Sequence, residues 1–313
     1  MSRELFFKTP EDKFRVFQKP RLIMFSEGSE VEIWTNTQPL YFYPFSWLDY
    51  LGKEGIRELY FQNVSSELAE KEINSLENGK VHFEQPNERL INLAKERGHK
   101  VSVICNLEEL LPEQIEGLSV SDFVRIRVND SSSDLEVLRG LPREHLLSCI
   151  KVYIGEGCDY ERLAMKAREI GFDFLHVARR LIPNQENQRI SEEEKQKIRY
   201  LQEIETEQFR VVIPSSLEER FARRFVITPR LGNVPSCDFS EYRRVVKGNS
   251  YYPCYTQQIL NMQGFTREGI ERNPGNCLDC ACIYENDMLH DIKTKMKRYK
   301  NPSFALEYIE NGK

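Results

Sequence analysis

Five cysteines lie close together near the carboxyl end of this 313-residue sequence, and their thiols could hold a metal. Sixteen residues separate Cys237 from Cys254, twenty-two separate Cys254 from Cys277, and Cys280 and Cys282 follow shortly after. Neighbouring cysteines can bind a metal from one turn, and remote ones tie that turn to another loop. Because a dense cysteine group in a cytosolic chain binds metal more often than it forms disulfides, we expect a metal site here.

The thiolates limit which metal this site can hold. Thiolate sulfur prefers zinc or an iron–sulfur cluster to hard cations. A [4Fe–4S] cluster needs four thiolates, and the sequence predicts Cys237, Cys254, Cys277 and Cys280 as its ligands. Cys282 either replaces Cys277 or Cys280 as a ligand or lies beside the cluster as a free thiol. The alternatives are a structural Zn²⁺ site and thiols without a metal, and spacing alone does not decide among them.

Two arginines and a histidine form a second group of candidates. Arg125 and Arg127 alternate along one expected strand, so both point to the same face of the sheet. If that face is the interior of a barrel, the arginines could bind a carboxylate or a phosphate. His176 on a later strand could face the barrel mouth, and all three residues are weak candidates for catalysis. The alternatives are a surface ladder of ion pairs for the arginines and ordinary packing for His176. Cys105 and Cys149 fall in apolar runs and are expected to be buried.

Short runs of β-branched and aromatic residues alternate with helical patterns between residues 31 and 213. Strand starts about every 22 to 43 residues match the period of a βα unit and predict a parallel sheet covered by helices. Six or seven units are fewer than a closed barrel needs. The sequence therefore predicts an α/β fold with a partial (β/α) TIM-like barrel of about six strands. The expected strands are 31–35, 58–61, 100–105, 122–128, 148–154, 173–177 and 209–213.

Three helices between these strands have clear boundaries. The pattern over 86–97 places an apolar stripe on one face and ends at Gly98, and the pattern over 158–170 ends at Gly171 in the same way. Ser191 and Glu194 form a capping box that opens a third helix, through about residue 205.

The composition divides the chain into three parts. Residues 1–30 are expected to form an N-terminal extension and a hairpin, with 21–25 and 31–35 as its strands. Residues 31–215 are expected to form the partial barrel. Proline and glycine become frequent after Pro214, so residues 216–313 are expected to form a small Cys-rich domain, followed by a helix over about 287–300.

Charge and hydropathy exclude several classes of protein. The net charge is −5 with interspersed signs, which gives no support to nucleic-acid binding. The mean hydropathy is −0.55, and no window approaches the roughly 18 apolar residues of a membrane helix. The first twelve residues lack the apolar stretch of a secretory signal. We therefore expect a cytoplasmic protein with no membrane partner.

The C-terminal cysteines resemble a known motif. Cys237, Gly248 and the stretch Tyr252-Pro253-Cys254-Tyr255, followed by the Cys277-x2-Cys280 pair, are similar to the SPASM or twitch extension of radical S-adenosylmethionine (radical SAM) enzymes. The segment 90–103 also resembles the third helix and strand of the radical SAM core. This resemblance covers roughly residues 20 to 285. It implies a partial barrel and an auxiliary [4Fe–4S] cluster.

The sequence departs from that family where the family cleaves its cofactor. Radical SAM enzymes carry a C-x3-C-x2-C loop after the first strand, but residues 34–47 contain no cysteine. The stretch 61–65 also replaces the glycine-rich segment that holds the amino group of S-adenosylmethionine. Reductive cleavage of S-adenosylmethionine is therefore not expected, because nothing holds an iron next to the sulfonium.

The resemblance implies a non-canonical radical SAM-like iron–sulfur protein of a biosynthetic or modification pathway. Relatives with this extension modify peptides or proteins, so a peptide or protein substrate, or a partner enzyme, is expected. The sequence leaves open whether the chain is itself an enzyme. One alternative is a non-radical enzyme that uses the barrel mouth and keeps a structural cluster. The other is a zinc-stabilised interaction module.

Overall fold

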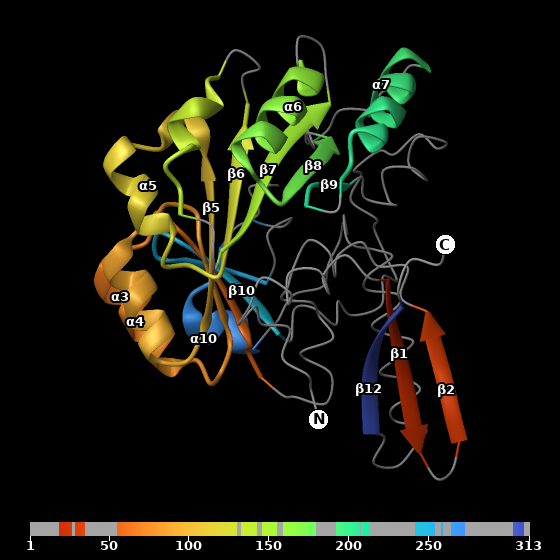
Figure 1. Cartoon of the computed structure of the whole chain (residues 1–313). Coiled ribbons are helices and arrows are strands. Elements are labelled where there is room, and N and C mark those ends of the chain that lie inside the picture. The colour runs from red at the N-terminus through yellow and green to blue at the C-terminus, as the bar shows by residue number, and fades with distance from the viewer. Residues whose placement is uncertain are drawn as a thin grey trace. The chain divides into compact units, whose positions relative to one another are not determined.

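The computed structural model of the chain (Figure 1) contains two compact units, residues 1–53 with 282–313 and residues 54–281, which are described separately. The described residues are 19–26, 29–34, 55–129, 133–142, 146–154, 159–179, 192–206, 208–212, 242–253, 258, 264–272 and 303–309.

The first unit contains a three-stranded antiparallel sheet in the order β12-β1-β2. Its strands are β1 (Lys19–Ser26), β2 (Ser29–Trp34) and β12 (Ser303–Ile309). The sequence predicted the hairpin of β1 and β2, but it also counted 31–35 among the strands of the barrel. The structure corrects that count, because β2 pairs with β1 in this separate sheet. The sequence did not predict β12.

The second unit is built on a nine-stranded sheet in the order β11-β10-β3-β4-β5-β6-β7-β8-β9. All neighbouring strands are parallel except β10 and β11. The α/β class with a parallel sheet is therefore confirmed, whereas closure or curvature into a barrel stays a prediction. The strands are β3 (Glu58–Gln62), β4 (Lys80–Phe83), β5 (Lys100–Asn106), β6 (Phe123–Val128), β7 (Leu147–Ile154), β8 (Phe174–Arg179), β9 (Arg210–Val212), β10 (Arg243–Lys247) and β11 (Ser250–Tyr252).

The helices follow the parallel strands, and two of them keep the predicted boundaries. The described helices are α3 (Ser66–Ser75), α4 (Glu88–Glu96), α5 (Pro112–Leu118), α6 (Tyr160–Ile170), α7 (Glu192–Glu203) and α10 (Arg267–Arg272). Gly98 after α4 and Gly171 after α6 have φ values of 78° and 93°, the left-handed conformation that glycine adopts without strain. Helix α7 is also where the sequence predicted it, but its proposed cap Ser191 lies outside the described residues.

The two faces of the parallel sheet differ in chemistry. On β6, Val124, Ile126 and Val128 belong to the apolar core that also contains the buried residues of the helices. Because side chains alternate along a strand, Arg125 and Arg127 lie on the opposite face. Figure 1 shows α3, α4 and α5 outside the strands that they connect. The helices thus cover the apolar face, and the other face carries polar side chains together with buried apolar ones such as Phe123 and Phe174.

Three strands of the second sheet were not predicted. The strand β4 has four residues, and its burial is continuous rather than alternating. The strands β10 and β11 come from the segment that the sequence assigned to the Cys-rich domain, and β10 pairs in parallel with β3. No helix in the described part of the chain is long and apolar enough to span a membrane.

Candidate functional site

The five cysteines predicted to hold a metal, Cys237, Cys254, Cys277, Cys280 and Cys282, all lie outside the described residues. Their proposed site therefore stays a prediction. Within the described ranges, no group of three or more histidine, cysteine or carboxylate side chains could hold a metal ion.

The hairpin of β10 and β11 occupies the sequence between Cys237 and Cys254. Lys247 pairs with Ser250 across its turn, where Gly248 has a φ of 57°. The N–H of Gly248 donates to the carbonyl oxygen of Gln62 at 3.1 Å, which ties the turn to the end of β3. The hairpin is thus attached to β3 of the parallel sheet.

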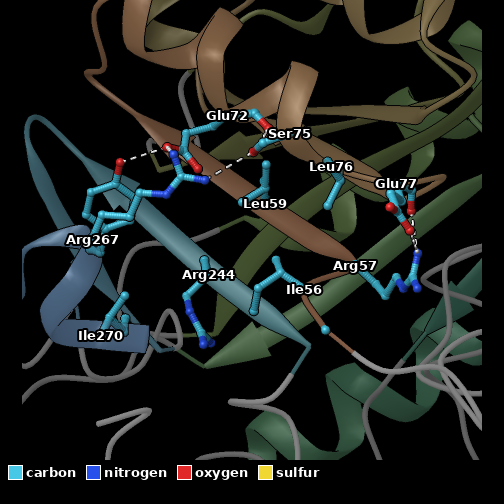
Figure 2. Close-up of a pocket in the computed structure, with 12 residues that line it drawn as sticks. Ile56, Arg57, Leu59, Glu72, Ser75, Leu76, Glu77, Arg244, Arg267 and Ile270 are labelled. Atoms are coloured by element: carbon cyan, nitrogen blue, oxygen red, sulfur yellow. Dashed lines mark hydrogen bonds and ion pairs between the residues drawn. The ribbon is translucent and has the colours of Figure 1, made fainter. Parts of the chain in front are cut away.

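A cavity of about 260 Å³ lies on the helix side of this hairpin, between α3 and α10. Figure 2 shows Arg267 reaching toward Glu72 and Ser75. Its guanidinium forms an ion pair with the buried Glu72 at 3.2 Å, and the hydroxyl of Tyr251 donates to the same carboxylate at 2.9 Å. These contacts join α10 and β11 to α3. The polar groups of the cavity therefore have a structural role in attaching the hairpin.

A buried carboxylate network joins four neighbouring strands, β10, β3, β4 and β5. We call Glu58, Tyr60, His82, Ser102 and Arg243 the Glu58 network. The Glu58 carboxylate accepts from the Tyr60 hydroxyl at 2.9 Å and lies 2.7 Å from Nε2 of His82. It also accepts from Nε of Arg243 on β10. On the far side of the imidazole, Nδ1 of His82 is 2.5 Å from the Ser102 hydroxyl.

Electrostatics fixes the charge states in the Glu58 network. Burial alone would raise the pKa of Glu58, but Arg243 and His82 outweigh it and hold that pKa well below its usual range. Burial lowers the pKa of His82 against the opposing effect of Glu58, so the imidazole is neutral. A neutral ring that donates from Nε2 to the carboxylate can accept from the Ser102 hydroxyl at Nδ1.

The order of serine, histidine and glutamate is that of a hydrolytic triad, but its location argues against catalysis. Glu58, His82 and Ser102 are 0%, 2% and 1% exposed, which leaves no access for a substrate. Glu58 is the first residue of β3, His82 is the third of four in β4 and Ser102 is the third of seven in β5. None of them follows the carboxyl end of its strand, where parallel α/β sheets bind ligands. We therefore assign the network a structural role. Sequence reasoning missed it because its members come from four different strands.

Basic side chains gather farther along the same face of the sheet. We call Arg125, Arg127, Lys151 and His176 the basic cluster. Arg127 on β6 is in register with Lys151 on β7, and Lys151 is in register with His176 on β8. Arg125 precedes Arg127 by two residues and shares its face. The structure thus brings the three residues singled out in the sequence onto one part of the sheet, around a lysine that sequence reasoning missed.

The members of the basic cluster are largely withdrawn from solvent. Arg125 is 4% exposed and His176 is 8% exposed, so neither belongs to a surface ladder. Arg127 forms an ion pair with Glu84 at 3.3 Å. The ammonium of Lys151 lies 5.0 Å from the centre of the Tyr153 ring.

Burial and mutual repulsion shift the pKa values in the basic cluster. Burial, Arg125 and Arg127 lower the pKa of Lys151 to about 7. Burial, Lys151 and Arg125 lower the pKa of His176 well below its usual value, which makes this imidazole neutral. Burial raises the pKa of the neighbouring Cys149 thiol to about 11, against the effect of Arg125. The cluster therefore combines two permanent cations, one amine that titrates near neutrality and a neutral imidazole.

The two strand cysteines are buried, as the sequence predicted. Cys105 is 3% exposed and Cys149 is fully buried. Burial raises the pKa of Cys105 to about 12. Both thiols are thus protonated at neutral pH and act as small apolar groups.

Comparison with known proteins finds distant structural likeness. No family model matches the sequence, and no curated protein matches it. SuiB from Streptococcus suis is 10% identical with a TM-score of 0.48, over 68% of this chain and 63% of SuiB. The structure of SuiB bound to the precursor peptide SuiA is 10% identical with a TM-score of 0.47, over 80% of this chain and 70% of SuiB. The structure of SuiB bound to S-adenosylmethionine is 11% identical with a TM-score of 0.44, over 79% of this chain and 69% of SuiB. Likeness at this level assigns no activity to the chain.

Proposed function

We propose that the chain is a radical SAM-like iron–sulfur protein that holds one auxiliary [4Fe–4S] cluster and does not cleave S-adenosylmethionine. The observation that carries this proposal is the hairpin of β10 and β11. It lies between Cys237 and Cys254, turns at Gly248 and extends a parallel α/β sheet. A hairpin with a glycine turn suits the spacing of the first two cysteines, because it returns the chain toward its starting point.

The fold of the cluster-binding protein is proposed to be a partial (β/α) barrel, with the Cys-rich segment packed beside it. Four of the five C-terminal cysteines would supply the thiolates. A cluster with four thiolate ligands has no open iron site, so it would transfer electrons or stabilise the fold. The proposed substrate or partner is a peptide or protein, which is the class that the sequence resemblance implies.

Metal analysis tests this proposal directly. The full-length protein, purified without oxygen, should contain about four iron and four sulfide per chain. Replacing Cys254 with serine should remove most of the iron, whereas Cys105→Ala should keep it, because Cys105 is buried on β5 far from the motif in sequence. Stoichiometric zinc without iron would support a zinc-stabilised module and overturn the cluster.

Single replacements identify the ligands. Serine variants of Cys237, Cys254, Cys277 and Cys280 should each lower the iron content and the visible absorbance of the cluster. The variant Cys282→Ser should retain both. Loss of the cluster in Cys282→Ser but not in Cys280→Ser would assign Cys282 as the fourth ligand instead.

A further inference from the structure

The basic cluster behaves as one electrostatic group. Lys151 is its centre, because Arg125 and Arg127 each disfavour its charged form, and Lys151 in turn disfavours a charge on His176. Like charges shift one another in this way only when they lie within a few ångströms or in a medium of low dielectric constant. The cluster therefore gathers positive charge on one part of the sheet, and Glu84, the ion-pair partner of Arg127, offsets part of it.

The geometry of the cluster suits a single ligand. Neighbouring strands lie about 4.8 Å apart, so residues in register on β6, β7 and β8 lie side by side on one face of the sheet. Arg127 and Lys151 lie in the carboxyl-terminal half of their strands, the end at which parallel α/β sheets bind ligands, whereas His176 is the third of six residues in β8. The Glu58 network lies closer to the other end of the same face, because Ser102 is in register with Phe123, two residues before Arg125.

We propose that Arg125, Arg127 and Lys151 form a binding site for one anionic group, a carboxylate or a phosphate. The guanidinium groups offer paired N–H donors that match the oxygen atoms of either anion. Lys151 adds a compact charge between them, and the neutral ring of His176 adds one N–H donor. This site uses no cysteine and does not depend on the proposed iron–sulfur cluster.

Binding of an anion at this site is coupled to protonation of Lys151. Among the described residues, the groups that interact electrostatically with Lys151 are Arg125, Arg127, the neutral His176 and the protonated thiol of Cys149. The carboxylate of Glu84 pairs with Arg127 beside them. Lys151 is thus the member of the cluster that titrates between pH 6 and 8. A bound anion favours the ammonium form of Lys151, so the protein takes up a proton at Lys151 when the anion binds above pH 7. Affinity should therefore fall as the pH rises through about 7.

Calorimetry with inorganic phosphate and with succinate tests the site in the full-length protein. Replacing Lys151 with methionine should weaken binding at pH 6.5 by about tenfold or more, because it removes a charge-assisted contact. The control Lys71→Met removes the same charge from an exposed position on α3 and should bind like the wild type. Tight binding of phosphate alone identifies a phosphate site, and tight binding of succinate alone identifies a carboxylate site. Equal binding by the wild type and Lys151→Met overturns the proposal.

Chemical labelling of the wild type keeps the test independent of how the variant folds. At pH 7.5 an amine with a pKa of about 7 is mostly unprotonated, so Lys151 should react with acetic anhydride despite its burial, and peptide mass spectrometry measures its labelling with the exposed Lys71 as the reference. Phosphate or succinate should slow the labelling of Lys151 at least severalfold and leave that of Lys71 unchanged. If neither anion changes the labelling of Lys151, the site does not exist.

Discussion

One buried carboxylate connects strands that are far apart in the sequence. Glu58 on β3 binds Arg243 on β10, 185 residues later, and His82 on β4. Burying a carboxylate is costly unless charges and donors compensate for it. The three donors of the Glu58 network do so here, and the result is a fixed link between the sheet and the hairpin that follows Cys237.

Removing the charge of Glu58 should destabilise the fold. In Glu58→Gln, the guanidinium of Arg243 loses its buried partner, which should cost about 3 kcal/mol in the free energy of unfolding. Urea denaturation measures the change. The matched control is Glu77→Gln, because the Glu77 side chain is 87% exposed and contributes little. An equal effect of both replacements would contradict the assigned role.

Lys151 should make stability depend on pH. Its pKa falls from 10.5 in the free side chain to about 7 in the folded protein. The unfolded chain therefore binds more protons between these two values, and the free energy of unfolding should rise with pH across that window. The variant Lys151→Met should lack this part of the rise. Urea denaturation at pH 7, 8 and 9 compares the two proteins. Parallel dependence of their unfolding free energies on pH would show that folding does not lower the pKa of Lys151.

At the scale of elements, local signals were predictable from the sequence and distant pairings were not. The helices α4 and α6 end at Gly98 and Gly171, whose role depends on the adjacent turn alone. The strand β10 depends on pairing with β3, and the position of Lys151 beside Arg127 depends on strand register. Neither relation can be read from spacing along the chain. The sequence did single out Arg125 and Arg127, because their alternation is visible within one strand.

The turn at Gly248 should be sensitive to any side chain. Its φ of 57° disfavours residues other than glycine, although a Cβ atom there would meet no other atom within 4 Å. Gly248→Ala should therefore destabilise the protein by about 1 kcal/mol through backbone conformation alone. Gly140 has similar free space but no positive φ, so Gly140→Ala should be neutral in the same thermal or urea denaturation. Equal stability of the two variants would refute this explanation.

At the scale of the whole molecule, the two compact units should respond separately to a change in one of them. The strand β12 pairs with β1 through seven residue pairs in the first unit. Deleting residues 303–313 should expose the backbone amides of β1 to solvent and accelerate their hydrogen exchange. Strands β4 to β8 should keep their protection, because they belong to the second unit. Uniform loss of protection in both units would show that they unfold together.

The pairing of β1 with β12 also has a consequence for biosynthesis. Lys19 lies opposite Ile309, although 290 positions separate them along the chain. During translation, β1 leaves the ribosome long before its partner has been made, and it can pair with β2 only as an isolated two-stranded hairpin, which is marginally stable in water. The parallel strands β3 to β9 can assemble while synthesis continues. The small antiparallel sheet can therefore be completed only after the ribosome has delivered β12.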